Sequence, residues 1–341
     1  MTLVDTAERL GLESVLKLPE RLLRVLAGKP VVVDGQTLAT DVQLQLRLKR
    51  VARQAASETL PMAQGREVLR HDTRLTGGDQ PIGSTRDLEV AGRPARLYVP
   101  TGAPATGPML VFLHGGGFMH GDLDTHDAPC RFQAENAGVR VLAIDYRLGP
   151  EHRFPAAYDD ALAAYAWTVE HAAELGADPD RLGVGGDSAG GTLSAVVAIE
   201  AARRGWPCRV QLLVYPAADG RRTTRSAELF ADGFYLTKAY MDLANASYAA
   251  SDADLDDPRF SPIRADVPDG VAPALVFTAG FDPLRDEGEA YAAKLADAGV
   301  QVELTRFPDQ LHGFFNIVGV GRRSRAAVDE IAVALRTGLG A

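Results

Sequence analysis

The chain has 341 residues, of which 46% are hydrophobic and 24% are charged. This size and composition suit one large α/β domain with a smaller appended cap. The net charge is −9, with acidic and basic residues interspersed, so the sequence predicts no basic face for nucleic-acid binding.

Features that would direct the chain into or across a membrane are missing from the sequence. No run of eighteen apolar residues is present, and residues 1–9 lack the basic start and apolar stretch of a signal peptide. Cys130 and Cys208 do not make a disulfide framework and indicate free thiols in a reducing compartment. We therefore expect a soluble cytoplasmic protein without stable membrane insertion.

The N-terminal 66 residues predict helices. Leucine and valine recur at helical spacing over residues 4–27, and Pro19 interrupts them as the first-turn proline of a second helix. Residues 41–55 form a further amphipathic stretch. These helices either pack on the core or form part of a lid, and we assign residues 1–66 to an N-terminal helical cap segment.

From about residue 67 the pattern becomes that of an α/β core. A hairpin over residues 87–99 precedes alternating strands and helices, which predict a mostly parallel sheet with helices on both faces. The polar, turn-rich region 217–270 interrupts this alternation and is assigned to a second cap segment, which leaves core segments 67–216 and 271–341. Within it we expect one helical piece that carries aromatic residues, at residues 230–248. We expect strands at 109–113, 139–144, 182–185, 210–215, 274–278 and 302–307, and helices at 128–137, 158–173, 190–204, 286–298 and 322–339.

A glycine-flanked serine follows the strand expected at residues 182–185. Gly186-Asp187-Ser188-Ala189-Gly190 has the G-x-S-x-G pattern of a nucleophile elbow. So sharp a turn strains the serine backbone and requires small neighbours, which Gly186 and Gly190 supply. An N-cap serine after a glycine-rich loop would show the same letters. The preceding strand and the following helix favour the elbow.

A second glycine-rich motif, His114-Gly115-Gly116-Gly117, follows the apolar strand that ends at Leu113. Acyl transfer builds negative charge on a carbonyl oxygen, and backbone N–H groups stabilise that charge. We expect Gly116, Gly117 and Ala189 to supply these groups, with Gly115 needed for the turn. Neither glycine pattern of a phosphate-binding loop is present, so a phosphate cradle is not predicted.

The acid and the base are expected in the chain order Ser, Asp, His. His312 is the only histidine beyond Ser188, and Asp282 follows the strand at residues 274–278. Both therefore fall at the same end of a parallel sheet as Ser188. Asp286 and Glu287 compete for the acid, but we expect them to cap the next helix or to face solvent.

Residues 114–127 gather histidines and carboxylates, but their spacing does not match the zinc motif His-Glu-x-x-His. We predict neither a metal nor a cofactor. The charged residues between Tyr146 and Pro155 are expected to form a buried ion-pair network that braces the glycine-rich loop of residues 114–117. As walls of the substrate pocket we name Phe118, Met119, Tyr215, Phe281, Leu311 and Phe314.

Taken together, these motifs resemble the hormone-sensitive-lipase-like family (family IV) of α/β-hydrolase esterases. The resemblance implies the α/β-hydrolase fold, with Ser188 as nucleophile, His312 as general base and Asp282 as the orienting acid. It rests on His114–Phe118, Gly121-Asp122, Tyr146–Leu148, Pro150-Glu151, Pro155–Ala157, Gly186–Gly190, Asp282–Asp286 and His312–Phe314.

We therefore expect a serine carboxylesterase that hydrolyses esters of short to medium acyl chains. Three alternatives remain open: an amidase or peptidase on the same triad, an interfacial lipase, and a non-catalytic ligand-binding relative. The expected partner is a small-molecule ester. The strand at residues 302–307, near a sheet edge, offers a surface for a homodimer.

Overall fold

The computed structural model describes residues 3–341, with side chains from residue 6 onward. Within this range eight strands form one sheet, in the order β10-β9-β8-β7-β5-β6-β4-β3. All neighbours pair in parallel except β4 with β6 and β3 with β4, which are antiparallel. The bounds are β3 Ser84–Val90, β4 Arg93–Val99, β5 Gly107–Leu113, β6 Arg140–Ile144, β7 Ala177–Asp187, β8 Val210–Val214, β9 Ala274–Phe281 and β10 Val302–Leu311.

Local sequence explains why these segments are strands. Every residue of β5 is buried, as expected for a central parallel strand covered on both faces. The β3–β4 hairpin turns through Ala91 and Gly92, whose φ values of 49° and 76° match the two-residue turn that fits the strand twist. The strand at the other edge, β10, leaves Leu304 45% exposed.

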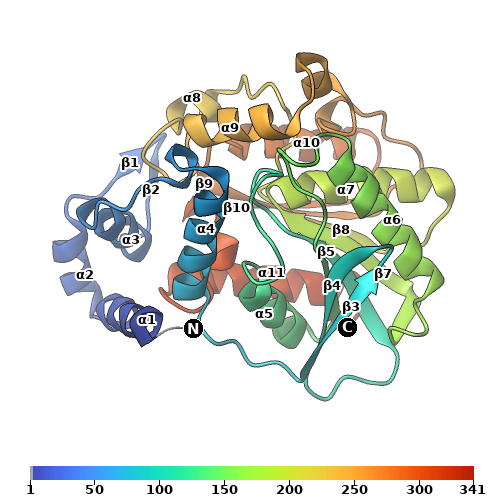
Figure 1. The fold of residues 1–341 in the computed structure, drawn as a ribbon, viewed down its shortest axis with the longest axis horizontal. Coiled ribbons are helices and arrows are strands. Elements are labelled where there is room, and N and C mark those ends of the chain that lie inside the picture. Colours follow the sequence, from blue (N-terminus) through green and yellow to red (C-terminus); the bar gives the residue numbers. More distant parts are fainter. Residues whose placement is uncertain (1–2) are drawn as a thin grey trace.

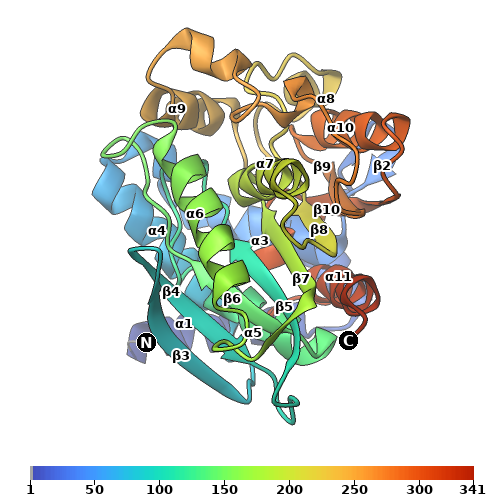
Figure 2. The ribbon, with the colours of Figure 1, turned by 90° about the vertical axis from the view of Figure 1, so that its right-hand side faces the viewer.

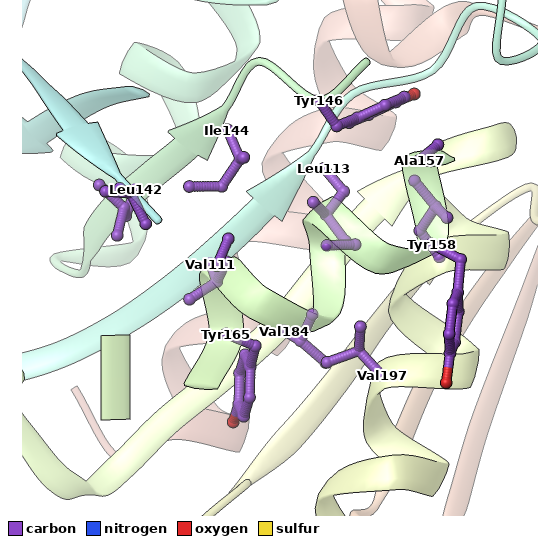
Figure 3. Close-up of a cluster of buried hydrophobic side chains, with 14 of the residues drawn as sticks. Val111, Leu113, Leu142, Ile144, Tyr146, Ala157, Tyr158, Tyr165, Val184 and Val197 are labelled. Atoms are coloured by element: carbon purple, nitrogen blue, oxygen red, sulfur yellow. The ribbon is translucent and has the colours of Figure 1, made fainter. Parts of the chain in front are cut away.

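Helices cover both faces of the sheet, as predicted. On one face α6 (Ala156–Glu170) and α7 (Ala189–Arg204) pack over β5, β6 and β7, and Figure 3 shows this apolar cluster with Val111, Leu142 and Val184 in it. Helix α10 (Arg285–Asp297) joins that face. On the other face lie α5 (Asp127–Ala137) and α11 (Arg323–Leu339). The α/β-hydrolase fold expected from the sequence is confirmed.

Further elements lie beyond the sheet. In Figures 1 and 2, α8 and α9 lie at the top of the molecule, and Figure 1 shows β1, β2 and α4 beside them. Their bounds are α1 Leu3–Leu16, α2 Glu20–Ala27, β1 Val32–Val33, β2 Gln36–Thr37, α3 Thr40–Val51, α4 Met62–Gly77, α8 Arg225–Leu229 and α9 Lys238–Tyr248. Residues 1 and 2 of the expected N-terminal segment lie outside the described residues.

Two details of this region differ from the expectation. Helix α4 was not predicted, and it runs unbroken through the expected boundary between residues 66 and 67. The helical piece expected from residue 230 begins only at Lys238, after a turn-rich stretch. In the part of the chain that the structure describes, no helix is both long and apolar enough to cross a membrane.

Candidate active site

Ser188 stands on the turn between β7 and α7. Its φ of 54° and ψ of −119° place it in a strained conformation that few non-glycine residues adopt. A Cβ atom on Gly186 would lie 2.1 Å from the carbonyl oxygen of Leu113, and one on Gly190 only 1.8 Å from the same oxygen. Both positions therefore require glycine, because β5 approaches the turn from directly beside it.

A chain of hydrogen bonds joins Ser188 to His312 and Asp282. The Ser188 Oγ atom lies 3.0 Å from Nε2 of His312, and Nδ1 of His312 lies 2.8 Å from Oδ2 of Asp282. The Leu284 amide donates to the other carboxylate oxygen of Asp282, which is fully buried. The structure brings all three residues together because each follows the carboxyl end of its strand: β7, β9 or β10.

The two competitors for the acid position lie elsewhere. Asp286 accepts a hydrogen bond from the Ser226 amide. Glu287 is buried, so the expectation that it caps its helix or faces solvent is wrong. Its carboxyl accepts hydrogen bonds from the amides of Ala218 and Asp219, and burial raises its pKa to about 8.

The glycine-rich loop curls beside Ser188. Gly116 and Gly117 have φ values of 122° and 63°, and a Cβ atom on Gly116 would lie 2.2 Å from the His120 carbonyl oxygen. The Gly115 amide is already bonded, since it donates to Oδ1 of Asp187 at 2.8 Å. Gly116, Gly117 and Ala189 line the same cavity as Ser188.

Bracing of this loop comes from fewer charged residues of the 146–155 stretch than expected. The Tyr146 hydroxyl donates to the His114 carbonyl at 2.5 Å. Arg147 instead pairs with Asp160 on α6. The main charged brace is Arg66 of α4, a residue that the motifs did not point to. Its guanidinium donates to the Met119 and Gly149 carbonyls and pairs with Glu151.

Asp187 links the glycine-rich loop to the residues that pack on His312. It lies 3.2 Å from Nε2 of His126 and accepts a hydrogen bond from the Tyr215 hydroxyl at 3.3 Å. The Tyr215 ring in turn lies 4.4 Å from the His312 ring. Burial alone would raise the pKa of Asp187, but His126 and the Gly115 amide outweigh it and lower that pKa.

Two histidines of the 114–127 segment, which gathers histidines and carboxylates, favour the neutral form. Burial lowers the pKa of His114 and of His120 to about 4. The His120 ring accepts or donates a hydrogen bond with the Tyr240 hydroxyl. Among the residues that the structure describes, no three His, Cys, Asp or Glu side chains are grouped as metal ligands would be.

Above Ser188 opens a cavity of about 660 Å³. Of the six residues proposed as its walls, Phe118 lines it. Leu311 borders a smaller neighbouring pocket, and Met119, Tyr215, Phe281 and Phe314 are buried in the core. These five assignments are therefore wrong. The residues were chosen because they lie near catalytic positions in the sequence, but their side chains lie behind the site rather than in the cavity.

The cavity walls come mainly from elements outside the sheet, most of them within residues 1–66 and 217–270, the segments assigned to a cap from the sequence. Helix α3 contributes Leu46 and Lys49, and the loop before α9 contributes Tyr235 and Leu236. The Arg50 side chain of α3 donates to the Gly233 carbonyl, and the Thr237 hydroxyl donates to the Glu58 carboxylate. The N-terminal residues that line the cavity therefore also contact the stretch that leads into α9. The remaining lining residues of α4 and α9 are Val68, Leu69, Asp72, Tyr240, Met241 and Ala244.

Comparison with known proteins matches residues 110–316 to the α/β-hydrolase fold family. The chain belongs to that family. The carboxylic ester hydrolase LipN of Mycobacterium tuberculosis is 45% identical over 98% of this chain and 92% of its own length. The ethyl acetate hydrolase of Pseudomonas putida is 39% identical over 82% of this chain and 93% of its own. The resemblance drawn from the motifs is confirmed.

Solved structures agree with this family membership. The ester hydrolase EH1AB1 from the metagenome of Lake Arreo superimposes with a TM-score of 0.86 at 39% identity, covering 89% of this chain and 100% of its own. An esterase from Pyrobaculum calidifontis gives a TM-score of 0.84 at 35% identity, covering 88% and 98%. The fold is therefore shared over nearly the whole of these neighbours.

Proposed function

We propose that this α/β-hydrolase is a serine carboxylesterase that cleaves small-molecule esters of short to medium acyl chains through an acyl-enzyme. The observation that carries the proposal is the hydrogen-bonded chain from Ser188 through His312 to Asp282 at the floor of the cavity. The names of the relatives, LipN and ethyl acetate hydrolase among them, support ester hydrolysis as the reaction.

In the first half of the reaction, Ser188 Oγ attacks the ester carbonyl carbon while Nε2 of His312 takes its proton. Asp282 accepts a hydrogen bond from Nδ1 of His312, which fixes the tautomer and stabilises the imidazolium that forms. The tetrahedral intermediate then collapses, and His312 returns the proton to the oxygen of the departing alcohol. Water, activated in the same way, hydrolyses the acyl-enzyme.

The negative charge of each tetrahedral intermediate falls on the former carbonyl oxygen. The N–H groups of Gly116, Gly117 and Ala189 are proposed to hold it, because these residues line the cavity beside Ser188. The N-terminus of α7 adds a favourable dipole at the same point. Gly115 is left out, since its amide already donates to Asp187.

We also propose that residues 1–66 and 217–270 act as a cap over this site. Support comes from the cavity walls, to which α3 and the 232–244 stretch contribute. Because α4 continues to Gly77 and lines the cavity through Val68, Leu69 and Asp72, the cap includes the whole of that helix.

Hydrolysis of p-nitrophenyl esters from acetate to palmitate, by the wild type and by Ser188→Ala, tests the function. We expect turnover to be highest with short chains, to vanish in the variant and to be unchanged by EDTA. Activity that rises toward palmitate, and that appears only above the ester concentration at which micelles form, would favour an interfacial lipase. Faster cleavage of matched amides would favour an amidase, and equal behaviour of the variant would exclude the serine mechanism.

Two finer points belong to this proposal. The free thiols of Cys130 and Cys208 support a reducing location such as the cytoplasm. The exposed edge of β10, which carries Leu304, supports a homodimer formed through that strand. A molecular mass measured by light scattering, with Leu304→Lys as the variant, tests the dimer: a monomeric wild type would contradict it.

A further inference from the structure

A small side pocket of about 50 Å³ lies next to the main cavity. The two share part of their lining, so the shared residues form a wall between them. The residues that border both spaces are Leu46, Lys49, Asp72, Tyr235, Gly313 and Asn316, together with His312 itself. The wall therefore stands directly beside the proposed general base.

Three side chains from three separate elements build this wall. The Lys49 ammonium of α3 lies 2.6 Å from the Asp72 carboxylate of α4, and Gln54 donates to the other oxygen of that carboxylate. The same ammonium lies 4.9 Å from the centre of the Tyr235 ring, within cation–π range. Asp72 is buried and fully paired, so the wall is held in place from behind.

Tyr235 occupies its place at a cost in backbone strain. Its φ is 75°, a region that bulky residues rarely adopt, and the Lys49 ammonium of α3 lies over its ring. Its ring lies so close to Gly313 that a Cβ atom at residue 313 would be 3.0 Å from it. A glycine at position 235 would adopt this φ without strain, so the backbone conformation does not itself require the tyrosine ring.

The position of the wall decides which part of an ester it meets. His312 must deliver its proton to the oxygen of the departing alcohol, so that alcohol lies on the His312 side of Ser188. The acyl oxygen points instead toward the loop of Gly116 and Gly117. A wall that borders His312 and Gly313 consequently limits the alcohol portion of the substrate, and the side pocket lies behind it.

We propose that Tyr235, held by the Lys49–Asp72 pair, is the residue that sets the longest alcohol portion this enzyme accepts. The inference rests on the proposed esterase function and deepens it. It assigns short-chain alcohols, rather than long or bulky ones, as the leaving groups of the natural substrates. Loss of the ring joins the side pocket to the main cavity and lengthens the space available to the alcohol.

The test uses two sets of esters, and their hydrolysis is monitored by titration of the acid that is released. The first keeps the acetyl group and varies the alcohol from ethyl to octyl; the second keeps ethanol and varies the acyl group from acetyl to octanoyl. Tyr235→Gly, which tolerates the φ of 75°, should raise the ratio of kcat/KM for octyl over ethyl acetate about tenfold. That factor corresponds to burying nearly two additional methylene groups. The acyl series should keep its wild-type profile.

Two control variants separate this effect from general loosening of the cap. Tyr235→Phe keeps the ring and should keep the wild-type profile. Phe234→Gly removes the neighbouring ring, which packs on Phe230 and Phe281 and does not line the cavity, so it should leave the octyl-to-ethyl ratio unchanged. If Tyr235→Gly does not fold, Tyr235→Asn, which also tolerates a positive φ and lacks the ring, gives the same comparison.

An octyl-to-ethyl ratio in Tyr235→Gly equal to that of the wild type would overturn the inference. So would a shift in the acyl series instead of the alcohol series, since the wall would then bound the other part of the ester. Those results leave the esterase function intact, because the wild type still turns over. A wild type inactive on every ester would remove the proposed function, and this inference with it.

Discussion

Replacement of Gly190 by alanine tests the close approach on which the serine turn depends. The new Cβ atom would lie 1.8 Å from the Leu113 carbonyl oxygen, where ordinary contact begins at 3.4 Å. The obstacle is backbone of the central strand β5, which cannot rotate away as a side chain would. We therefore expect a loss of about 3 kcal/mol or more in the free energy of unfolding, the upper end for overpacked cores.

Catalysis should fall together with stability. Ser188 lies two residues away, and a displacement of about 1 Å at a reacting group costs roughly 100-fold in rate. Urea unfolding and kcat on p-nitrophenyl acetate measure the two effects. Gly11→Ala is the matched control, because Gly11 has nothing within 4 Å and lies inside α1, where alanine adds up to about 1 kcal/mol. A Gly190→Ala protein with wild-type stability and rate would refute the reasoning.

Three further changes probe the buried polar groups. Because burial raises the pKa of Glu287 to about 8 from 4.5, the folded protein keeps a proton that the unfolded chain releases, and stability falls as pH rises between those values. The free energy of unfolding of Glu287→Gln minus that of the wild type, measured with urea, should thus grow by on the order of 3 kcal/mol from pH 5 to pH 8.5. A difference that does not grow with pH would contradict the burial argument. Tyr146→Phe leaves the buried His114 carbonyl without its donor and should cost about 1–3 kcal/mol in the same assay, and an unchanged free energy of unfolding would contradict the role given to this hydrogen bond. Asp282→Asn should lower kcat about 10⁴-fold with little change in KM, and a fall below tenfold would argue against its pairing with His312.

Most of the sheet could be predicted because its strands are short apolar runs bounded by glycines and polar turns. Helix α4 escaped prediction for the opposite reason. Its buried residues include Gly65, Asp72, Thr73 and Gly77, so no apolar repeat at helical spacing reveals it. The edge position of β10, by contrast, agreed with the sequence, since the last strand of the alternating series has no later strand to pair with.

The sequence by itself determined the order Ser188, Asp282, His312 and the glycines around the serine. These features are local: each follows from a strand end or from a backbone turn that tolerates only small residues. Tertiary structure alone decided which other segments line the cavity around them. The amides of Ala218 and Asp219 reach the buried Glu287 from a distant loop, and Tyr235 lines the same pocket as His312 with Lys49 of α3 over its ring. Such contacts depend on packing between segments far apart in the chain, and no periodicity within one segment encodes them.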